Sequence, residues 1–239
     1  KRILGAQIDF TNEASEAYDF LREALIERTQ KNPGDLNYSE MLTWLFIQRK
    51  NFSAALVHIK ALDKRSLENG RQLYRFGSVC VENNDFRTAR IAYKSVLALR
   101  VESPYFLKSQ RALLNVNFLE VTSNRNFNQV ELNEIVEEYG DVLNIYGKGK
   151  KTLAVMLELA HIQAFYANQG REALALLNEA LLIRGLRPKE LAEVKMKLSD
   201  IHVLHGDVWE ASLLYMQVDA EFKFEPIGHE AKFKNARIF

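Results

Sequence analysis

Two arginines one helical turn apart, Arg71 and Arg75, are the side chains of this sequence best suited to hold an anion. Residues at i and i+4 lie on one face of a helix, so both guanidinium groups can reach the same ligand. Each guanidinium can bind a carboxylate through two hydrogen bonds, which makes a carboxylate the expected ligand. The alternative is a solvated helix face that carries ordinary charges.

A second group of polar and aromatic residues precedes the arginines at helical spacing. It consists of Asn37, Glu40, Trp44 and Gln48. A tryptophan flanked by amides can anchor an extended or helical peptide, because Trp is enriched among the residues that contribute most to binding. With Tyr74 and the two arginines, these residues form our candidate groove for a partner. The alternative is that Trp44 packs against neighbouring helices as part of the core.

Other residues with chemical potential have simpler explanations. His202 and His205 lie one helical turn apart and could hold a metal ion, but packing and capping of a helix end explain both, and no third ligand is evident. Residues 147–152 contain Gly-Lys pairs but lack the earlier glycine and the strand of a phosphate-binding loop. Cys80 stands at an apolar position without a basic neighbour that would activate a thiol. We therefore expect no enzyme activity, cofactor, metal or small-molecule substrate.

Composition excludes two further classes of partner. Lys and Arg number 32 and Asp and Glu 31, for a formal net charge of +1. That balance provides no field to attract nucleic acid or anionic lipid. No apolar run approaches the roughly 18 residues needed to span a bilayer, so we expect no membrane insertion. The partner is expected to be a protein or peptide.

A recurring helix–turn–helix phrase supplies the elements that must position these residues. Each copy places a turn-tolerant residue, an aromatic or aliphatic residue and a small alanine between two amphipathic helical stretches. The copies occupy residues 50–56, 84–90, 169–174 and 206–212. Aligned alanines such as Ala55 and Ala89 are separated by about 34 residues, a period that indicates a solenoid of stacked helical hairpins.

The phrase divides the chain into about six hairpins. Regular hairpins are expected over residues 35–65, 66–100, 152–185 and 188–224, and a longer, degenerate one over 103–146. Residues 1–10 are predicted to end a helix, and residues 226–239 are predicted to begin a further repeat. We therefore predict a single solenoid over residues 1–239, truncated at both ends as a fragment of a longer protein, with a bend near residues 147–151.

Another helix is predicted near the start of the chain, from Ala14. Helical spacing places Ala17, Leu21, Ala24 and Leu25 on its apolar face. This helix is expected to be the second helix of an interrupted repeat.

The repeats resemble the tetratricopeptide-repeat (TPR) family. The residues that carry the resemblance are Gly77, Ala89 and Tyr93 in one hairpin and Leu198, Gly206, Ala211 and Tyr215 in another. The whole string, including residues 16–23 and 209–215, looks like long multi-repeat envelope proteins of Bacteroidetes-type bacteria. The resemblance implies an all-α, right-handed α-α superhelix in the periplasm or cell envelope, with the cytoplasm as the alternative.

For function, the same resemblance implies a non-enzymatic scaffold or adaptor that binds a partner segment in its concave groove. The family's carboxylate-clamping mode uses Lys, Arg and Asn from adjacent first helices, whereas Glu40 and Trp44 stand where Lys and Asn would be needed. The rival hypothesis is a regulatory or dimerisation arm of a larger enzyme or sensor whose catalytic domain lies outside this fragment.

Overall fold

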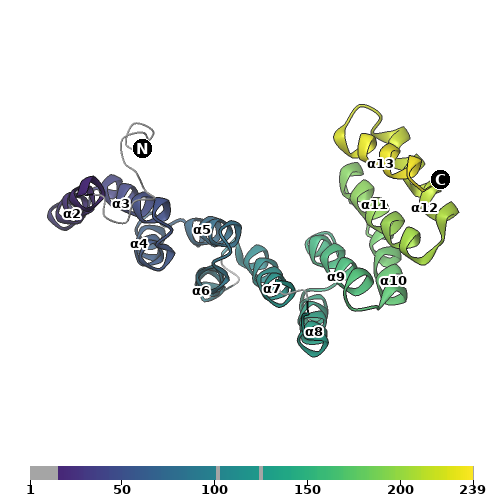
Figure 1. Cartoon of the computed structure of the whole chain (residues 1–239), viewed down its shortest axis with the longest axis horizontal. Helices are drawn as coiled ribbons and strands as arrows, with labels where there is room; N and C mark the ends of the chain where they lie inside the picture. Colours follow the sequence, from purple (N-terminus) through teal and green to yellow (C-terminus); the bar gives the residue numbers. More distant parts are fainter. Residues whose placement is uncertain (1–15, 101–102, 124–125, 239) are drawn as a thin grey trace. The chain divides into compact units, whose positions relative to one another are not determined.

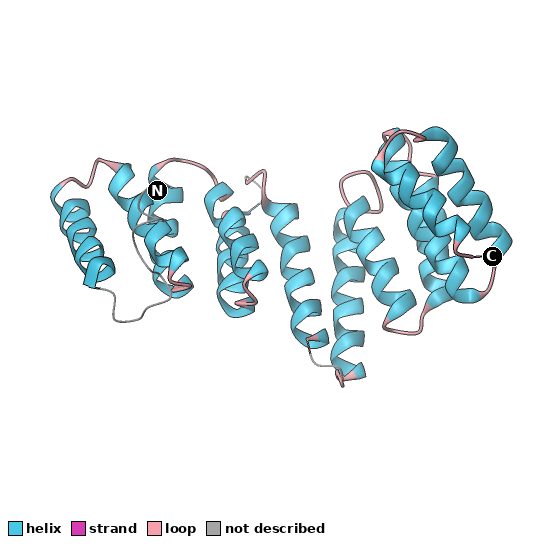
Figure 2. Ribbon diagram, turned by 45° about the horizontal axis from the view of Figure 1, so that its top comes forward, coloured by secondary structure: helices cyan, strands magenta, loops and turns pink. Residues whose placement is uncertain are grey.

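The chain folds into helices throughout its described part. The computed structural model describes residues 16–100, 103–123 and 126–238, and these residues form twelve α-helices and no β-strand (Figures 1 and 2). The helix end predicted within residues 1–10 and the helix start predicted at Ala14 lie outside the described residues.

The residues group into two compact units, Lys1–Glu120 and Val121–Phe239. The first unit contains α2 (Glu16–Lys31), α3 (Leu36–Gln48), α4 (Phe52–Arg65), α5 (Arg71–Glu82), α6 (Phe86–Leu97) and nearly all of α7 (Phe106–Thr122). The second unit contains α8 (Gln129–Tyr146), α9 (Leu153–Phe165), α10 (Gly170–Leu181), α11 (Pro188–His205), α12 (Val208–Glu221) and α13 (Pro226–Ala236).

Within each unit, consecutive helices pack as hairpins. In the first unit α3 packs on α4 and α5 on α6, and in the second α9 packs on α10 and α11 on α12. Next-but-one helices also touch, α4 with α6 and α9 with α11. Figure 1 shows α3 and α5 on one side of the first unit and α4 and α6 on the other. The predicted all-α fold of stacked helical hairpins is confirmed, and four regular hairpins lie where the sequence predicted them.

The turn-tolerant residue of the recurring phrase has a specific backbone role. Lys50, Asn84 and Gly206, the first residues of three copies, have positive φ angles of 55°, 60° and 84°, and Asn168, one residue before the copy at 169–174, has a φ of 54°. In this left-handed conformation one residue ends the first helix and reverses the chain. Glycine and asparagine tolerate the conformation best, which explains their recurrence at these turns.

Polar side chains then start the second helix of two of these hairpins. The Asn51 side chain accepts a hydrogen bond from the backbone N–H of Ala54, and Asp85 accepts one from Thr88. An N-cap of this kind contributes about 1 kcal/mol, because it satisfies a backbone donor that the helix leaves unpaired. The phrase therefore ends one helix and starts the next.

The small residues of the phrase and the TPR-like positions form the core. Ala55, Ala89 and Ala211 are completely buried, and Tyr93 is almost so. A Cβ atom at Gly77 would lie 2.5 Å from Cε1 of Tyr93, so only glycine permits this approach of α5 to α6. Gly77 therefore marks a close contact between these two helices.

The apolar face of α2 differs in part from the expected one. Leu25 is buried as predicted, whereas Ala17 is exposed and its neighbour Tyr18 is buried instead. The guanidinium of Arg49 lies over the Tyr18 ring, 4.2 Å from its centroid. Burial raises the pKa of the Tyr18 hydroxyl, although Arg49 and Arg22 oppose the shift. Tyr18 therefore joins α2 to the end of α3.

The lysine-rich link at residues 147–151 is a hydrogen-bonded turn inside the second unit. The buried Thr152 hydroxyl donates to the carbonyl of Gly147 at 2.6 Å and accepts from the N–H of Gly149 at 3.0 Å. The ammonium of Lys150 donates to the carbonyl of Gly185 at 2.7 Å. The bend at this link stays a prediction, while the division between compact units falls at residues 120 and 121.

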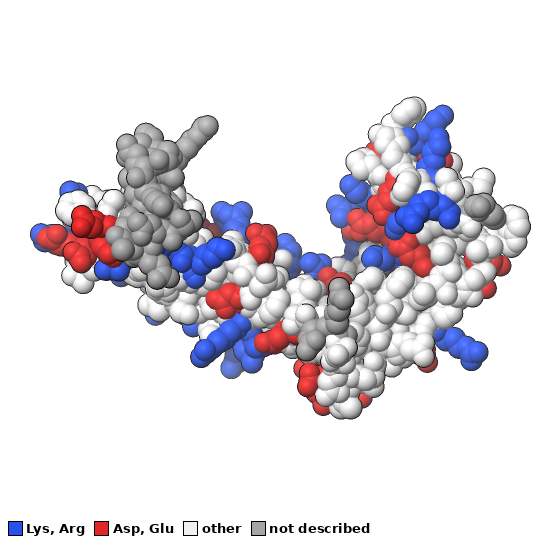
Figure 3. Space-filling view, in the orientation of Figure 1, with Lys and Arg blue, Asp and Glu red and all other residues white. Residues whose placement is uncertain are grey.

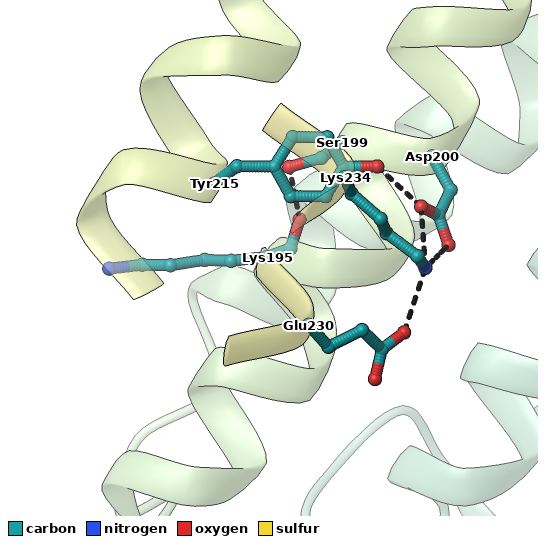
Figure 4. Close-up of polar contacts among 6 residues, drawn as sticks. All are labelled: Lys195, Ser199, Asp200, Tyr215, Glu230 and Lys234. Atoms are coloured by element: carbon teal, nitrogen blue, oxygen red, sulfur yellow. Dashed lines mark hydrogen bonds and ion pairs between the residues drawn. The ribbon is translucent and has the colours of Figure 1, made fainter. Parts of the chain in front are cut away.

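A polar cluster joins α11, α12 and α13 (Figure 4). The Tyr215 hydroxyl donates to Oδ1 of Asp200 at 2.5 Å, and Nζ of Lys234 lies 3.0 Å from both Asp200 oxygens. Lys234 also pairs with Glu230 at 3.0 Å. Burial raises the pKa of Tyr215, and the Asp200 carboxylate raises it further, so the phenol remains a donor. The TPR-like position Tyr215 therefore helps to hold α13 on the preceding hairpin.

Two observations bear on surfaces that could meet lipid or nucleic acid. None of the helices in residues 16–100, 103–123 and 126–238 combines the length and apolarity needed to cross a bilayer. On the face drawn in Figure 3, Lys and Arg are interspersed with Asp and Glu.

The single cysteine provides a probe of the first unit. Cys80 is completely buried on α5, and burial, aided by the Asp85 carboxylate, raises the pKa of its thiol to about 12. We expect the native thiol to react with Ellman's reagent at pH 8 at least about a thousand times more slowly than the thiol of urea-unfolded protein, because reaction requires local opening. Equal rates in the two states would contradict the burial of Cys80.

Candidate partner-binding groove

A pocket of about 420 Å³ lies between α3 and α5 in the first unit. Residues of α3 at i, i+3, i+4 and i+7 form one wall, and one face of α5 with the loop before it forms the other. Two buried residues of α4 close the pocket from below. The lining residues are Glu40, Thr43, Trp44 and Ile47 from α3, Ile59 and Leu62 from α4, and Glu68, Arg71, Gln72, Arg75, Phe76 and Val79 from the loop and α5.

Trp44 has two roles in this arrangement. Its side chain is half-buried and packs against the buried core of the unit, and it also lines the pocket. The two alternatives considered for this residue are therefore compatible. The core contact fixes the indole, so a ligand would meet an aromatic surface that is already oriented.

The charged residues of the pocket come in balanced numbers. Nε of Arg71 lies 3.0 Å from Oε2 of Glu68, and Arg71 remains 46% exposed. Arg75 is exposed and makes no ion pair with any residue that the structure describes. Glu40 adds a second carboxylate from the opposite wall. Among the described residues, two guanidinium groups and two carboxylates therefore line the pocket, and their formal charges cancel.

A buried carboxylate positions the arginine-bearing helix. Asp63, at the end of α4, accepts hydrogen bonds from the N–H of Gly70 at 2.8 Å and of Gln72 at 3.0 Å. Gly70, at the N-cap position of α5, has a φ of 92° and offers no side chain for capping. Asp63 therefore replaces the missing N-cap from the preceding helix, and its negative charge favours the positive end of α5.

The loop before α5 is held from a second direction. The Ser103 hydroxyl donates to the carbonyl of Asn69 at 2.6 Å, and Ser103 is buried. Leu67 and Asn69 have positive φ angles of 53° and 49°. This conformation is uncommon for residues with a Cβ, and the two anchored hydrogen-bonding groups hold the loop in it. Glu68 and Arg71 are thus presented from a fixed backbone.

The structure brings together part of the predicted set. Glu40, Trp44, Arg71 and Arg75 line one pocket, whereas Asn37, Gln48 and Tyr74 are outside its lining. The amide of Asn37 donates to Asp35 at 2.8 Å at the start of α3. Gln48 is exposed at the last position of α3.

Tyr74 belongs to a different contact. Its ring lies 5.9 Å from that of Tyr93 and 5.6 Å from that of Tyr105, centroid to centroid. The side chain thus packs toward α6 and the start of the next hairpin. The prediction that Tyr74 shares a patch with Trp44 followed from helical spacing alone, which does not specify the neighbouring helix that a side chain meets.

Three residues important for the geometry were missed by the sequence reasoning. Glu68, Asp63 and Ser103 all act on the loop between α4 and α5. Glu68 could have been found from its i,i+3 spacing to Arg71. Asp63 was harder to identify than Glu68. Its only sequence signal is that an acidic residue directly follows the apolar Leu62 within a helical pattern.

Comparisons with known proteins support the fold. No protein-family model matches the chain, and no curated protein matches its sequence. Among solved structures, the chain is similar to a thermophilic TPR protein of Thermus thermophilus, with a TM-score of 0.58 at 14% identity over 85% of this chain and 98% of that one. It is also similar to nearly identical TPR-like repeats from Podosopora anserina, with a TM-score of 0.50 at 22% identity over 79% and 95% of the two chains. These similarities show a TPR-like fold.

Proposed function

We propose that this chain, whose fold is TPR-like, is a non-enzymatic scaffold or adaptor that binds a segment of a partner protein between α3 and α5. The observation that carries the proposal is a single pocket in which Trp44 and two arginines surround an apolar floor. Tryptophan and arginine are the residue types that most often dominate binding free energies. The pocket volume also lies within the range of about 300–1,000 Å³ that is typical of ligand sites.

Preorganisation supports the same proposal. The core contact of Trp44 and the anchored loop before α5 fix both walls of the groove before a partner arrives. A rigid groove loses little side-chain entropy on binding, so more of the contact free energy contributes to affinity. An extended or helical segment that spans α3 and α5 would meet several fixed side chains at once.

The test uses peptides selected from a random-peptide phage library on the wild-type protein. The affinity of labelled peptides is measured by fluorescence anisotropy. We expect Trp44→Ala to weaken binding by at least about tenfold, because it removes the aromatic anchor. The double variant Arg71→Ala/Arg75→Ala is expected to weaken it by about tenfold through the loss of charge-assisted hydrogen bonds.

Two controls locate the binding. The chain has two tryptophans, Trp44 and Trp209, so the variant Trp209→Phe leaves Trp44 as its only indole, whose emission should shift as peptide is added. Arg87→Ala changes an exposed arginine of α6 outside the pocket and should bind like wild type. If every selected peptide binds wild type, Trp44→Ala and Arg71→Ala/Arg75→Ala with equal affinity, the proposal is wrong.

The location in the periplasm or cell envelope, with the cytoplasm as its alternative, stays a prediction from the sequence. So does the rival hypothesis of a regulatory or dimerisation arm.

A further inference from the structure

We infer that the groove between α3 and α5 binds an internal segment of its partner, in which an apolar anchor lies between one acidic and one basic residue, and not a free carboxyl terminus. This inference rests on the proposed function and specifies the ligand of the same groove.

The charge balance of the pocket disfavours a chain terminus as ligand. A free carboxylate is held best where several cationic donors converge without competing anions. Here the Arg71 guanidinium already pairs with Glu68 at 3.0 Å, and Glu40 places a further carboxylate in the same lining. A terminal carboxylate would therefore compete with Glu68 for Arg71 and be repelled by Glu40.

The other charged residues of the lining match side chains of opposite sign. Arg75, on α5, has no ion-pair partner among the described residues and suits an acidic side chain. Glu40, on α3, suits a basic side chain. Because the two residues come from different helices, their charges stand on opposite walls of the groove. A segment must therefore present both signs, and their order would determine its direction across the groove.

The floor of the pocket is apolar. It is formed by the buried residues Ile59 and Leu62 of α4, and Trp44, Ile47, Phe76 and Val79 add apolar surface from the two walls. Burial of an aliphatic or aromatic side chain on such a floor removes apolar surface from water without leaving a buried polar group unpaired. The anchor is therefore expected between the two charged residues of the ligand.

The experiment compares two formats of the same random-peptide phage library. In one format the peptide is fused through its carboxyl end and has no free carboxyl terminus, and in the other its carboxyl terminus is free. We expect wild-type protein to enrich peptides from the fused format, with an apolar residue flanked by Asp or Glu on one side and Lys or Arg on the other. For a selected peptide, the amidated and free-acid forms should bind within about twofold of each other.

Charge reversal provides the decisive comparison. Arg75→Glu should weaken binding of the selected peptide by at least about tenfold. A peptide with Lys in place of its acidic residue should recover the affinity for this variant. Glu40→Lys should likewise weaken binding of the selected peptide, and a peptide with an acidic residue in place of its basic one should recover the affinity for that variant. Arg87→Glu, an exposed reversal outside the pocket, should leave the affinity unchanged. Circular dichroism of each variant checks that the helices are retained.

The outcomes separate the inference from the proposed function. If no peptide is enriched on wild type relative to Trp44→Ala, the proposed function itself is wrong. Groove-dependent peptides that require a free carboxyl terminus overturn the inference and leave the proposed function standing. The same holds for groove-dependent peptides whose charge preference is unchanged by Arg75→Glu and Glu40→Lys.

Discussion

Replacement of Asp63 by alanine is expected to lower the free energy of unfolding of the first unit by about 2–4 kcal/mol. The Asp63 side chain is buried, and its two oxygens accept hydrogen bonds from the N–H groups of Gly70 and Gln72. Alanine would leave both donors without a partner at the start of α5. It would also remove a negative charge from the positive end of the helix dipole. The measurement is urea unfolding followed by circular dichroism, with Cys80 labelling as a reporter of the first unit.

Two matched variants set the scale of this loss. Asp63→Asn keeps one acceptor oxygen at nearly the same volume and should cost about half as much as Asp63→Ala. Asp85→Ala removes an ordinary N-cap, whose side chain accepts a single hydrogen bond from Thr88, and should cost about 1 kcal/mol. Equal losses for Asp63→Ala and Asp85→Ala would show that Asp63 is no more than a surface cap.

Gly77→Ala is expected to destabilise the first unit by about 1–3 kcal/mol, although alanine is the better helix former. The new methyl carbon would lie 2.5 Å from Cε1 and 2.7 Å from Cζ of Tyr93. The Tyr93 ring is buried, its hydroxyl lies 3.3 Å from Oγ of Ser78, and the Tyr74 ring lies beside it at an interplanar angle of 50°. Because the ring cannot move away freely, α5 and α6 must separate to make room.

Gly140→Ala is the control for that prediction. Gly140 lies inside α8, and a Cβ atom there meets nothing within 4 Å. The same substitution should stabilise the second unit by up to about 1 kcal/mol, the propensity difference between the two residues. Urea unfolding of both variants, read by circular dichroism, gives the two signs. A stabilised Gly77→Ala protein would refute the close helix contact.

The fold could be predicted because its information is local. The turn, cap and alanine of each phrase lie within a few residues, as in Asn84, Asp85 and Ala89, and each has its own backbone or packing requirement. Where the phrase was missing, the prediction was less accurate. In α2, helical spacing alone did not identify Tyr18 as a core residue, because no copy of the phrase marks the buried face of that helix.

Less of the candidate groove could be predicted. Helical periodicity correctly grouped Arg71 with Arg75 and Glu40 with Trp44 on single faces. It also grouped Tyr74, Asn37 and Gln48 with them, and none of these lines the pocket. A periodic pattern states which residues share a face but not which neighbour that face meets, since this depends on how the helices cross.

The helical hairpins, their order and the turn residues of the recurring phrase follow from the amino-acid sequence alone, because they depend on contacts within one or two turns. Three features become visible only in the folded chain: Asp63 caps α5 from α4, Ser103 holds the carbonyl of Asn69, and the groove carries balanced charge. Each of these features brings together residues from different helices or loops. The left-handed loop conformations and the helix packing angles that bring them together are set by the folded core, and a one-dimensional sequence pattern specifies neither the conformations nor the angles.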